Sequence, residues 1–248
     1  MEILFYFFVY AIAGWICEDI YCGIGQRKFV NRGFLYGPYC PIYGFGSLIV
    51  IYLLSPFYDH PLLVFIGGVI FTSLLEYLTS WIMEVLFQER WWDYSSYPFN
   101  INGRVCLRNS LLFGVMAFVL MYLVHPHVYH LYHSLPFTLM RSIIIVVTCL
   151  FILDIILTVR HLLKRKNVTN DLIKSLENAK LQFEAEENKN VQLHREAFIN
   201  WAKANPEIAA KLISLKKFEN THVSKAFPDR ILFKKEMHEL IKAIKDKQ

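Results

Sequence analysis

Two glutamates lie inside the third of five long apolar segments of the chain, where a carboxyl group is costly. Glu76 is near the middle of this segment, residues 61–87, and Glu84 follows eight residues later, with Thr72 and Ser80 completing a polar series at four-residue spacing. On a helix this spacing places the four side chains along one stripe. An ionisable group within a membrane costs roughly 2.5–3.5 kcal/mol on insertion scales, so it usually faces protein or a water-filled cavity. We therefore treat both glutamates as candidates for a polar site; for Glu76 the alternative is a neutral, hydrogen-bonded structural carboxyl.

Two further acids lie toward the ends of other apolar segments. Glu18 is near the end of the first, residues 3–22, and Asp154 is near the end of the fifth, residues 137–157. Carboxyl groups at such positions can reach headgroup water, and we prefer that interpretation for Asp154. For Glu18, as for Glu84, membership of the polar site is the preferred interpretation and an interfacial position is the alternative.

The loop after the third apolar segment is dense in aromatic and polar residues. Paired Trp and flanking Tyr suit a membrane–water interface, so an aromatic belt is one interpretation of this loop. The other is a structured plug or binding loop, in which Asp93 and Asn100 supply polar contacts beside Arg104.

No motif for a bound metal or for nucleotide hydrolysis occurs in the sequence. The five cysteines lack paired spacing, and the histidines between His125 and His133 have no nearby carboxylate or cysteine, so we expect neither a disulfide framework nor a metal site. The chain also lacks a Gly-x4-Gly-Lys-Ser/Thr loop, a Gly-x-Ser-x-Gly elbow and a His-Glu-x-x-His helix. We predict no cofactor and favour a protein that is not an enzyme.

Membrane helices are the elements that must position these residues. The chain has 248 residues, 55% hydrophobic, with a mean hydropathy of +0.33, whereas a soluble domain is about 45–50% apolar. A helix needs about 20 mostly apolar residues to cross a bilayer, and five segments qualify: 3–22, 40–57, 61–87, 110–128 and 137–157. The second is the shortest, and prolines and glycines at its start favour a broken or re-entrant stretch there. The predicted fold class is an all-α polytopic membrane protein with five transmembrane helices.

The loops between these segments alternate in charge. Basic residues occur in the first loop, in the third loop and after the fifth segment, whereas the second and fourth loops, the latter His125 to Pro136, contain no Lys or Arg. The positive-inside rule then places the N-terminus outside and the C-terminus in the cytoplasm of a cell membrane.

The chain divides near Leu163 into two parts of different composition. Residues 1–163, the predicted transmembrane domain, have a net charge of −1, and residues 164–248, the predicted cytoplasmic tail, have a net charge of +6. Apolar stripes in the tail predict helices, and they are made by Leu172, Leu176, Ala179 and Phe183, by Ile208, Leu212 and Leu215, and by Ile231, Met237, Leu240, Ile241 and Ile244. Acids are interspersed among the tail's basic residues, so we expect no nucleic-acid binding.

Two stretches of the chain resemble each other. Gly14-Trp15-Ile16-Cys17-Glu18 and Ser80-Trp81-Ile82-Met83-Glu84 each end an odd-numbered segment, and an Asn-Gly-Arg cluster follows each, at residues 31–33 and 102–104. One interpretation is a parallel two-helix repeat, as in some transporters; the other is chance similarity between apolar segments.

The same resemblance predicts two ion pairs. Because a carboxylate partly removed from water needs a counter-charge, we predict that Glu18 is compensated by Arg32 and Glu84 by Arg104. A crossed pairing, Glu18 with Arg104, is the alternative.

The ordered polar motifs identify a family resemblance over roughly residues 5–155. Asn31-Arg32-Gly33-Phe34-Leu35-x-Gly37-Pro38, Glu76-x-x-Thr79-x-Trp81-x-x-Glu84, Trp92-Asp93-Tyr94-Ser95 and Asn100-x-x-Gly103-Arg104-x-Cys106-Leu107 resemble the bacterial family called putative ABC transporter type IV permeases. The resemblance implies a multi-pass membrane protein that serves as a membrane subunit and needs a separate ATPase.

These observations favour a permease-like protein whose polar cavity opens toward the cytoplasm. The candidate substrate-binding residues are Glu18, Asn31, Arg32, Glu76, Glu84, Asp93, Asn100 and Arg104. The alternatives are a non-transporting sensor, assembly or accessory protein that acts through its tail, and an intramembrane enzyme that acts on lipid with the acids and arginines as acid–base groups. We expect the lipid bilayer as a partner, and a separate ATPase subunit and a homo-oligomer are further candidates.

Overall fold

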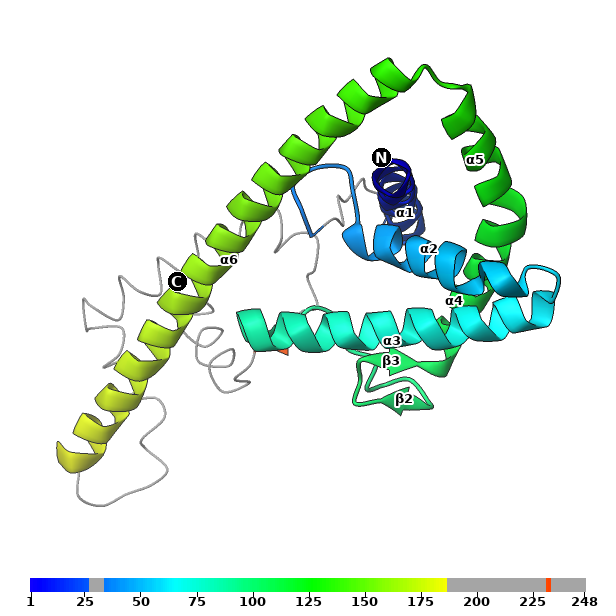
Figure 1. The fold of residues 1–248 in the computed structure, drawn as a ribbon. Coiled ribbons are helices and arrows are strands. Elements are labelled where there is room, and N and C mark those ends of the chain that lie inside the picture. The colour runs from blue at the N-terminus through cyan, green and yellow to red at the C-terminus, as the bar shows by residue number, and fades with distance from the viewer. Residues whose placement is uncertain (27–33, 187–230, 233–248) are drawn as a thin grey trace.

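The protein is mostly helical in a computed structural model that describes residues 1–26, 34–186 and 231–232 (Figure 1). Its helices are α1 (Glu2–Gln26), α2 (Pro41–Leu54), α3 (Pro61–Phe87), α4 (Leu107–Val119), α5 (His125–Ser134) and α6 (Phe137–Glu186), with a 3-10 turn η1 (Ser55–Phe57) and a π-helical turn η2 (Leu120–Val124). Four short strands complete it: β1 (Glu89–Arg90), β2 (Asn100–Ile101), β3 (Val105–Cys106) and β4 (Ile231–Leu232). β1 pairs with β4 and β2 with β3, both antiparallel.

Four helical segments are long and apolar enough to cross a membrane. They are Glu2–Ile20, Pro61–Phe87, Leu107–Ser134 and Phe137–Asp171, and they correspond to four of the five predicted spans. The remaining predicted span, α2 with η1, is a shorter apolar helix, Pro41–Phe57. The fold is therefore that of a helical membrane protein, and the continuous segment of α2 with η1 is shorter than the four candidate spans, as its sequence predicts.

The stretch before α2 has no regular structure and is packed against protein. Residues 34–40 lie between α1 and α2, and the N–H of Cys40 donates to the carbonyl of Ala11 on α1 at 2.8 Å. Leu35 is fully buried in a cluster with Ala11 and Tyr39. Irregular backbone at this position is tolerated because its polar groups are bonded within the protein.

Close approaches of α1 to α2 and of α3 to α4 hold two helix pairs together. Gly14 of α1 lies directly against the ring of Tyr43 of α2, and Gly114 of α4 lies against Phe65 and Val69 of α3. A β-carbon at either glycine would overlap these side chains, so both contacts depend on the absence of one. Between α2, α3 and α4 a core of Val50, Leu54, Val64, Ala117 and Met121 is buried.

The predicted fourth loop is helical. The chain continues as helix through α4, η2 and α5 to Ser134, so most of the connection that the sequence places from His125 to Pro136 is helical. Pro126 explains the π-helical turn just before it, because proline has no N–H to donate and its ring crowds the preceding turn. The N–H of His125 accordingly donates to the carbonyl of Leu120, five residues earlier.

Helix α6 is 50 residues long and continues without a break across Leu163. At about 1.5 Å per residue it is about 75 Å long, and Figure 1 shows it as a single straight rod beside the other helices. Leu172 and Phe183, from the first apolar stripe of the predicted tail, fall within the bounds of α6. Of the other two predicted tail helices, Ile231 lies in strand β4 instead, and the remaining residues fall outside the described part of the chain.

Candidate functional site

The loop after α3 folds back along that helix (Figure 1). Gln88 ends α3 in the left-handed conformation, with φ of 57°, and its N–H donates to the carbonyl of Glu84 at 2.8 Å. Phe87 and Trp91 are then buried against Leu162 of α6. This turn reverses the chain so that the loop's polar residues meet the C-terminal half of α3.

A hairpin of β2 and β3 gives this loop a fixed shape. Its strands pair with Asn100 opposite Cys106 and Ile101 opposite Val105. The turn contains Asn102 and Gly103 with φ of 53° and 67°, and the N–H of Arg104 donates to the carbonyl of Ile101 at 3.0 Å. Positive φ at both central residues is typical of the tight hairpin turns that Asn-Gly favours.

Two of the predicted site residues stabilise the loop itself. The side-chain oxygen of Asn100 accepts the N–H of Gly103 at 3.0 Å, and its amide donates to the carbonyl of Tyr97 at 2.8 Å. Asp93 accepts the N–H of Ser95 at 2.9 Å. These bonds use much of the hydrogen-bonding capacity of the Asn100 and Asp93 side chains. Both residues therefore bond within the loop after α3.

Glu84 lies between two arginines at the end of α3. The guanidinium of Arg104 is 2.7 Å from Oε2 of Glu84 and also donates to the hydroxyl of Ser80 at 3.3 Å. The guanidinium of Arg90 approaches the same carboxylate, with Nε 3.3 Å from Oε2, and lies 3.9 Å from Asp93. The predicted pairing of Glu84 with Arg104 is present, and the two acids balance the two arginines in charge.

Sequence reasoning missed Arg90 as a partner of Glu84. The two residues are six positions apart, a spacing that does not bring side chains together on a continuous helix. They meet because α3 ends at Phe87 and Gln88 turns the chain. The sequence feature that could have indicated this contact is the position of Arg90 just after the end of α3. A cation there also interacts favourably with the helix dipole.

Glu76 is buried on α3 with one bonded and one unbonded oxygen. The residue is 6% exposed, and the hydroxyl of Tyr94 donates to Oε1 at 3.1 Å. Oε2 is buried and has no hydrogen-bond partner among the described residues. Burial, together with the adjacent Glu76 carboxylate, raises the pKa of Tyr94 well above its usual range, so this hydroxyl stays a donor.

Glu18 faces the same region from α1. Oε1 of Glu18 accepts a hydrogen bond from the hydroxyl of Tyr43 at 2.6 Å, and Glu18 is close enough to Glu76 for the two acids to interact electrostatically. Tyr43 was not singled out as a partner from the sequence. Asn31 and Arg32 lie outside the described residues, so the pairing of Glu18 with Arg32 stays a prediction.

Asp154 is buried, and the preferred interpretation that it reaches headgroup water is wrong. Its side chain accepts the N–H groups of Tyr36 at 3.1 Å and Gly37 at 2.7 Å, and also the hydroxyl of Thr158. The segment before α2 thus docks on α6 through this carboxylate. Burial, and then the charge and hydrogen bond of Asp154, raise the pKa of Tyr39 to about 12.

A model of the family described as "Putative ABC-transporter type IV" matches residues 5–159 of the chain. The chain belongs to this family. No curated protein and no solved structure matches it. The match includes every residue of the predicted site and confirms the family resemblance seen in the sequence motifs.

In this member of the family the polar residues form two groups. Glu84, Arg104, Arg90, Asp93 and Asn100 belong to α3 and its loop, where they bond to one another or to the loop backbone. Glu76 and Glu18 make up the second group, deeper along α3 and on α1, and each is held by a tyrosine hydroxyl.

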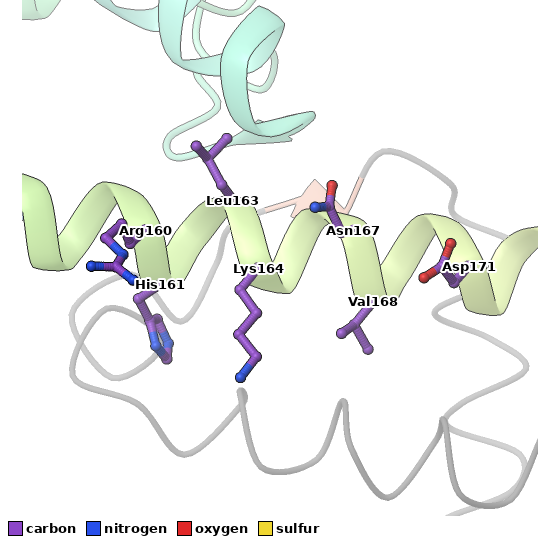
Figure 2. Close-up of a pocket in the computed structure, with 7 residues that line it drawn as sticks. All are labelled: Arg160, His161, Leu163, Lys164, Asn167, Val168 and Asp171. Atoms are coloured by element: carbon purple, nitrogen blue, oxygen red, sulfur yellow. The ribbon is translucent and has the colours of Figure 1, made fainter.

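A hollow in the surface lies on α6, apart from these residues (Figure 2). It has a volume of about 500 Å³ and is lined by Arg160, His161, Leu163, Lys164, Asn167, Val168 and Asp171. None of its lining residues belongs to the candidate site, and all of them follow residue 159, where the family match ends.

Proposed function

We propose that this chain is the permease-like membrane subunit of a transporter, with five membrane spans, an outer N-terminus and a cytoplasmic tail. The family description and four long apolar helices support a membrane protein of transporter type. The fifth span would be α2 with η1, which at 17 residues lies at the lower limit for crossing the hydrocarbon core.

One observation carries the proposal of a polar site between the helices. Glu76 is buried at mid-span with an oxygen that no described residue bonds, and an acid in such a position is a functional residue by default. In this proposal Glu76 and Glu18 contact the substrate, and Asn31 and Arg32 complete the lining.

The remaining predicted residues take a supporting role in this proposal. Glu84 has two guanidinium partners, so its charge is compensated before any substrate arrives. Arg104, Asp93 and Asn100 shape the loop that closes the cytoplasmic side of the site. A rigid support of this kind keeps the contacting groups in place.

A transporter of this type needs an energy source that the chain does not contain. Since the sequence lacks a phosphate-binding Gly-x4-Gly-Lys-Ser/Thr loop, a separate ATPase subunit would supply ATP hydrolysis. The full chain, tagged and purified in a mild detergent, is expected to retain an ATPase that mass spectrometry identifies. An unrelated multi-pass protein with the same tag is the control, and recovery of other partners without any ATPase would argue against transport.

A specific observation also favours a second function, that of a non-transporting accessory or sensor protein that acts through its tail. Helix α6 joins an apolar span to the basic region in one 50-residue helix, more than twice the length needed to cross a bilayer. Purification of a chain that lacks residues 187–248 distinguishes the accessory function from the permease function. Loss of the co-purifying partners would favour the accessory function, whereas retention of an ATPase by the shortened chain would favour the permease.

A further inference from the structure

The described surroundings of Glu76 leave the charge of this buried acid poorly compensated. The residue is 6% exposed, Oε1 receives one hydrogen bond from Tyr94, and Oε2 is buried without a hydrogen-bond partner in the described part of the chain. Glu76 also has no ion pair there, whereas Glu84, two helical turns further on, has two. A buried carboxylate with one donor is stable only if it gains a positive charge or becomes neutral.

The groups that face Glu76 from the neighbouring elements do not supply that charge. The loop after α3 contributes Tyr94, and Cys106 and the amide of Asn109 lie beside that tyrosine. From α1 comes Glu18, a second acid, which is itself bonded to Tyr43 of α2. From α6, Lys166 reaches α3, but its ammonium group donates to the carbonyl of Leu86, ten residues along α3 from Glu76.

We propose that Glu76 is a binding site for a single positive charge, taken up either as a proton or as a small monovalent cation such as sodium. This inference deepens the proposed function by naming what the polar site takes up, and it rests on α3 spanning the membrane. A proton would add to Oε2 and turn an unbonded acceptor into a neutral hydroxyl. A monovalent cation would instead lie against Oε2, between the two acids.

The geometry favours a single charge over a divalent metal. The described residues contain no group of three or more His, Cys, Asp or Glu side chains that could hold a metal ion. Calcium takes six to eight oxygen ligands and magnesium needs near-ideal octahedral geometry. Two carboxylates, each already bonded to a tyrosine, match the smaller requirement of one positive charge.

Occupancy of this site would reach the loop that folds along α3. Tyr94, the donor to Glu76, is also bonded through its N–H to the carbonyl of Gly103 at 2.8 Å. Gly103 precedes Arg104, the partner of Glu84. A change of charge at Glu76 therefore changes the group that accepts the hydrogen bond from the Tyr94 hydroxyl. Because Tyr94 is bonded to the hairpin of β2 and β3, the change can be passed to the hairpin and to Arg104.

Infrared difference spectroscopy of the full chain in lipid nanodiscs tests the proposal. Samples are titrated with acid, once in a sodium-free choline buffer and once with sodium chloride at equal ionic strength. The wild type should show the carbonyl band of a protonated carboxyl group, and Glu76→Gln should lack it. Asp59→Asn, which changes an exposed acid between η1 and α3, should retain it.

Tyr94→Phe keeps the test decisive if Glu76→Gln does not fold. This variant removes the hydroxyl that donates to Oε1, so the band should remain but change its frequency. The two buffers distinguish the ligands: a band that sodium leaves unchanged identifies a proton site, and a band that sodium suppresses identifies a cation site. Identical spectra for all variants in both buffers would overturn the proposal, as expected if Arg32 neutralises Glu76 permanently. The co-purified ATPase is a separate readout, so either idea can fail alone.

Discussion

Arg104 and Glu84 are joined by a nitrogen–oxygen contact of 2.7 Å that connects the hairpin after α3 to the last turns of that helix. The two residues are 20 positions apart in the sequence, and their side chains are only 11% and 18% exposed. The same guanidinium also bonds Ser80 and lies 5.7 Å from the ring centre of Tyr77. This ion pair is one polar link between helix and hairpin, and the hydrogen bond from the Asn102 amide to the Tyr77 hydroxyl at 3.0 Å is another.

Arg104→Ala should lower the stability of the protein by about 1.5–3 kcal/mol, the usual worth of hydrogen bonds to a charged group. The loss should be smaller than for an isolated buried pair, because Arg90 still contacts Glu84. Adding Glu84→Gln should recover part of it, since the unpaired charge is then removed. Thermal unfolding in detergent measures both effects. Arg108→Ala, an exposed arginine of α4, is the control, and an equal loss there would contradict the prediction.

Gly103→Ala should disrupt the hairpin. At φ of 67° a side chain costs roughly 1–2 kcal/mol, and the new β-carbon would also overlap Oδ1 of Asp93 and Oγ of Ser95. Gly46→Ala is the matched control, because its β-carbon would meet only Leu75, at 3.6 Å. Unfolding temperature and yield should fall for the first variant and stay unchanged for the second. Equal behaviour of the two would show that the turn tolerates a side chain.

Asp154→Ala should detach the segment before α2 from α6. The N–H groups of Tyr36 and Gly37 would lose their acceptor, and buried donors without partners are costly. We expect faster labelling of Cys40 by a membrane-permeant thiol reagent, measured in a background in which the other cysteines are replaced by serine. Asp59→Asn should leave the labelling rate unchanged. No acceleration in Asp154→Ala would mean that packing alone holds the segment.

The orientation of the chain can be tested with a reporter that is active only in the cytoplasm. Fusions after His60 and after Ser134 should be silent, and a fusion after Lys166 should be active, because Lys and Arg gather in alternate loops. Activity after His60 would exclude α2 as a span.

The sequence by itself determined the membrane class, the apolar segments and the positions of the costly acids. These properties are local: hydropathy is set by some 20 consecutive residues, and Glu76 stands in an apolar segment whatever surrounds it. The Asn102-Gly103 turn is local for the same reason, since positive φ at two successive positions favours this dipeptide.

The pairing of Glu84 with Arg104 was predicted from the sequence, but only the tertiary structure decided the other partners of the acids. Glu84 acquires Arg90 because a left-handed residue ends α3 and turns the chain, and Asp154 is buried because the segment before α2 docks on α6. The bond between Tyr94 and Glu76 likewise depends on how far the loop folds back along α3. Such pairings join residues 6 to 118 positions apart. No local pattern specifies them, because they depend on the path of the chain between helices and on which helix faces meet.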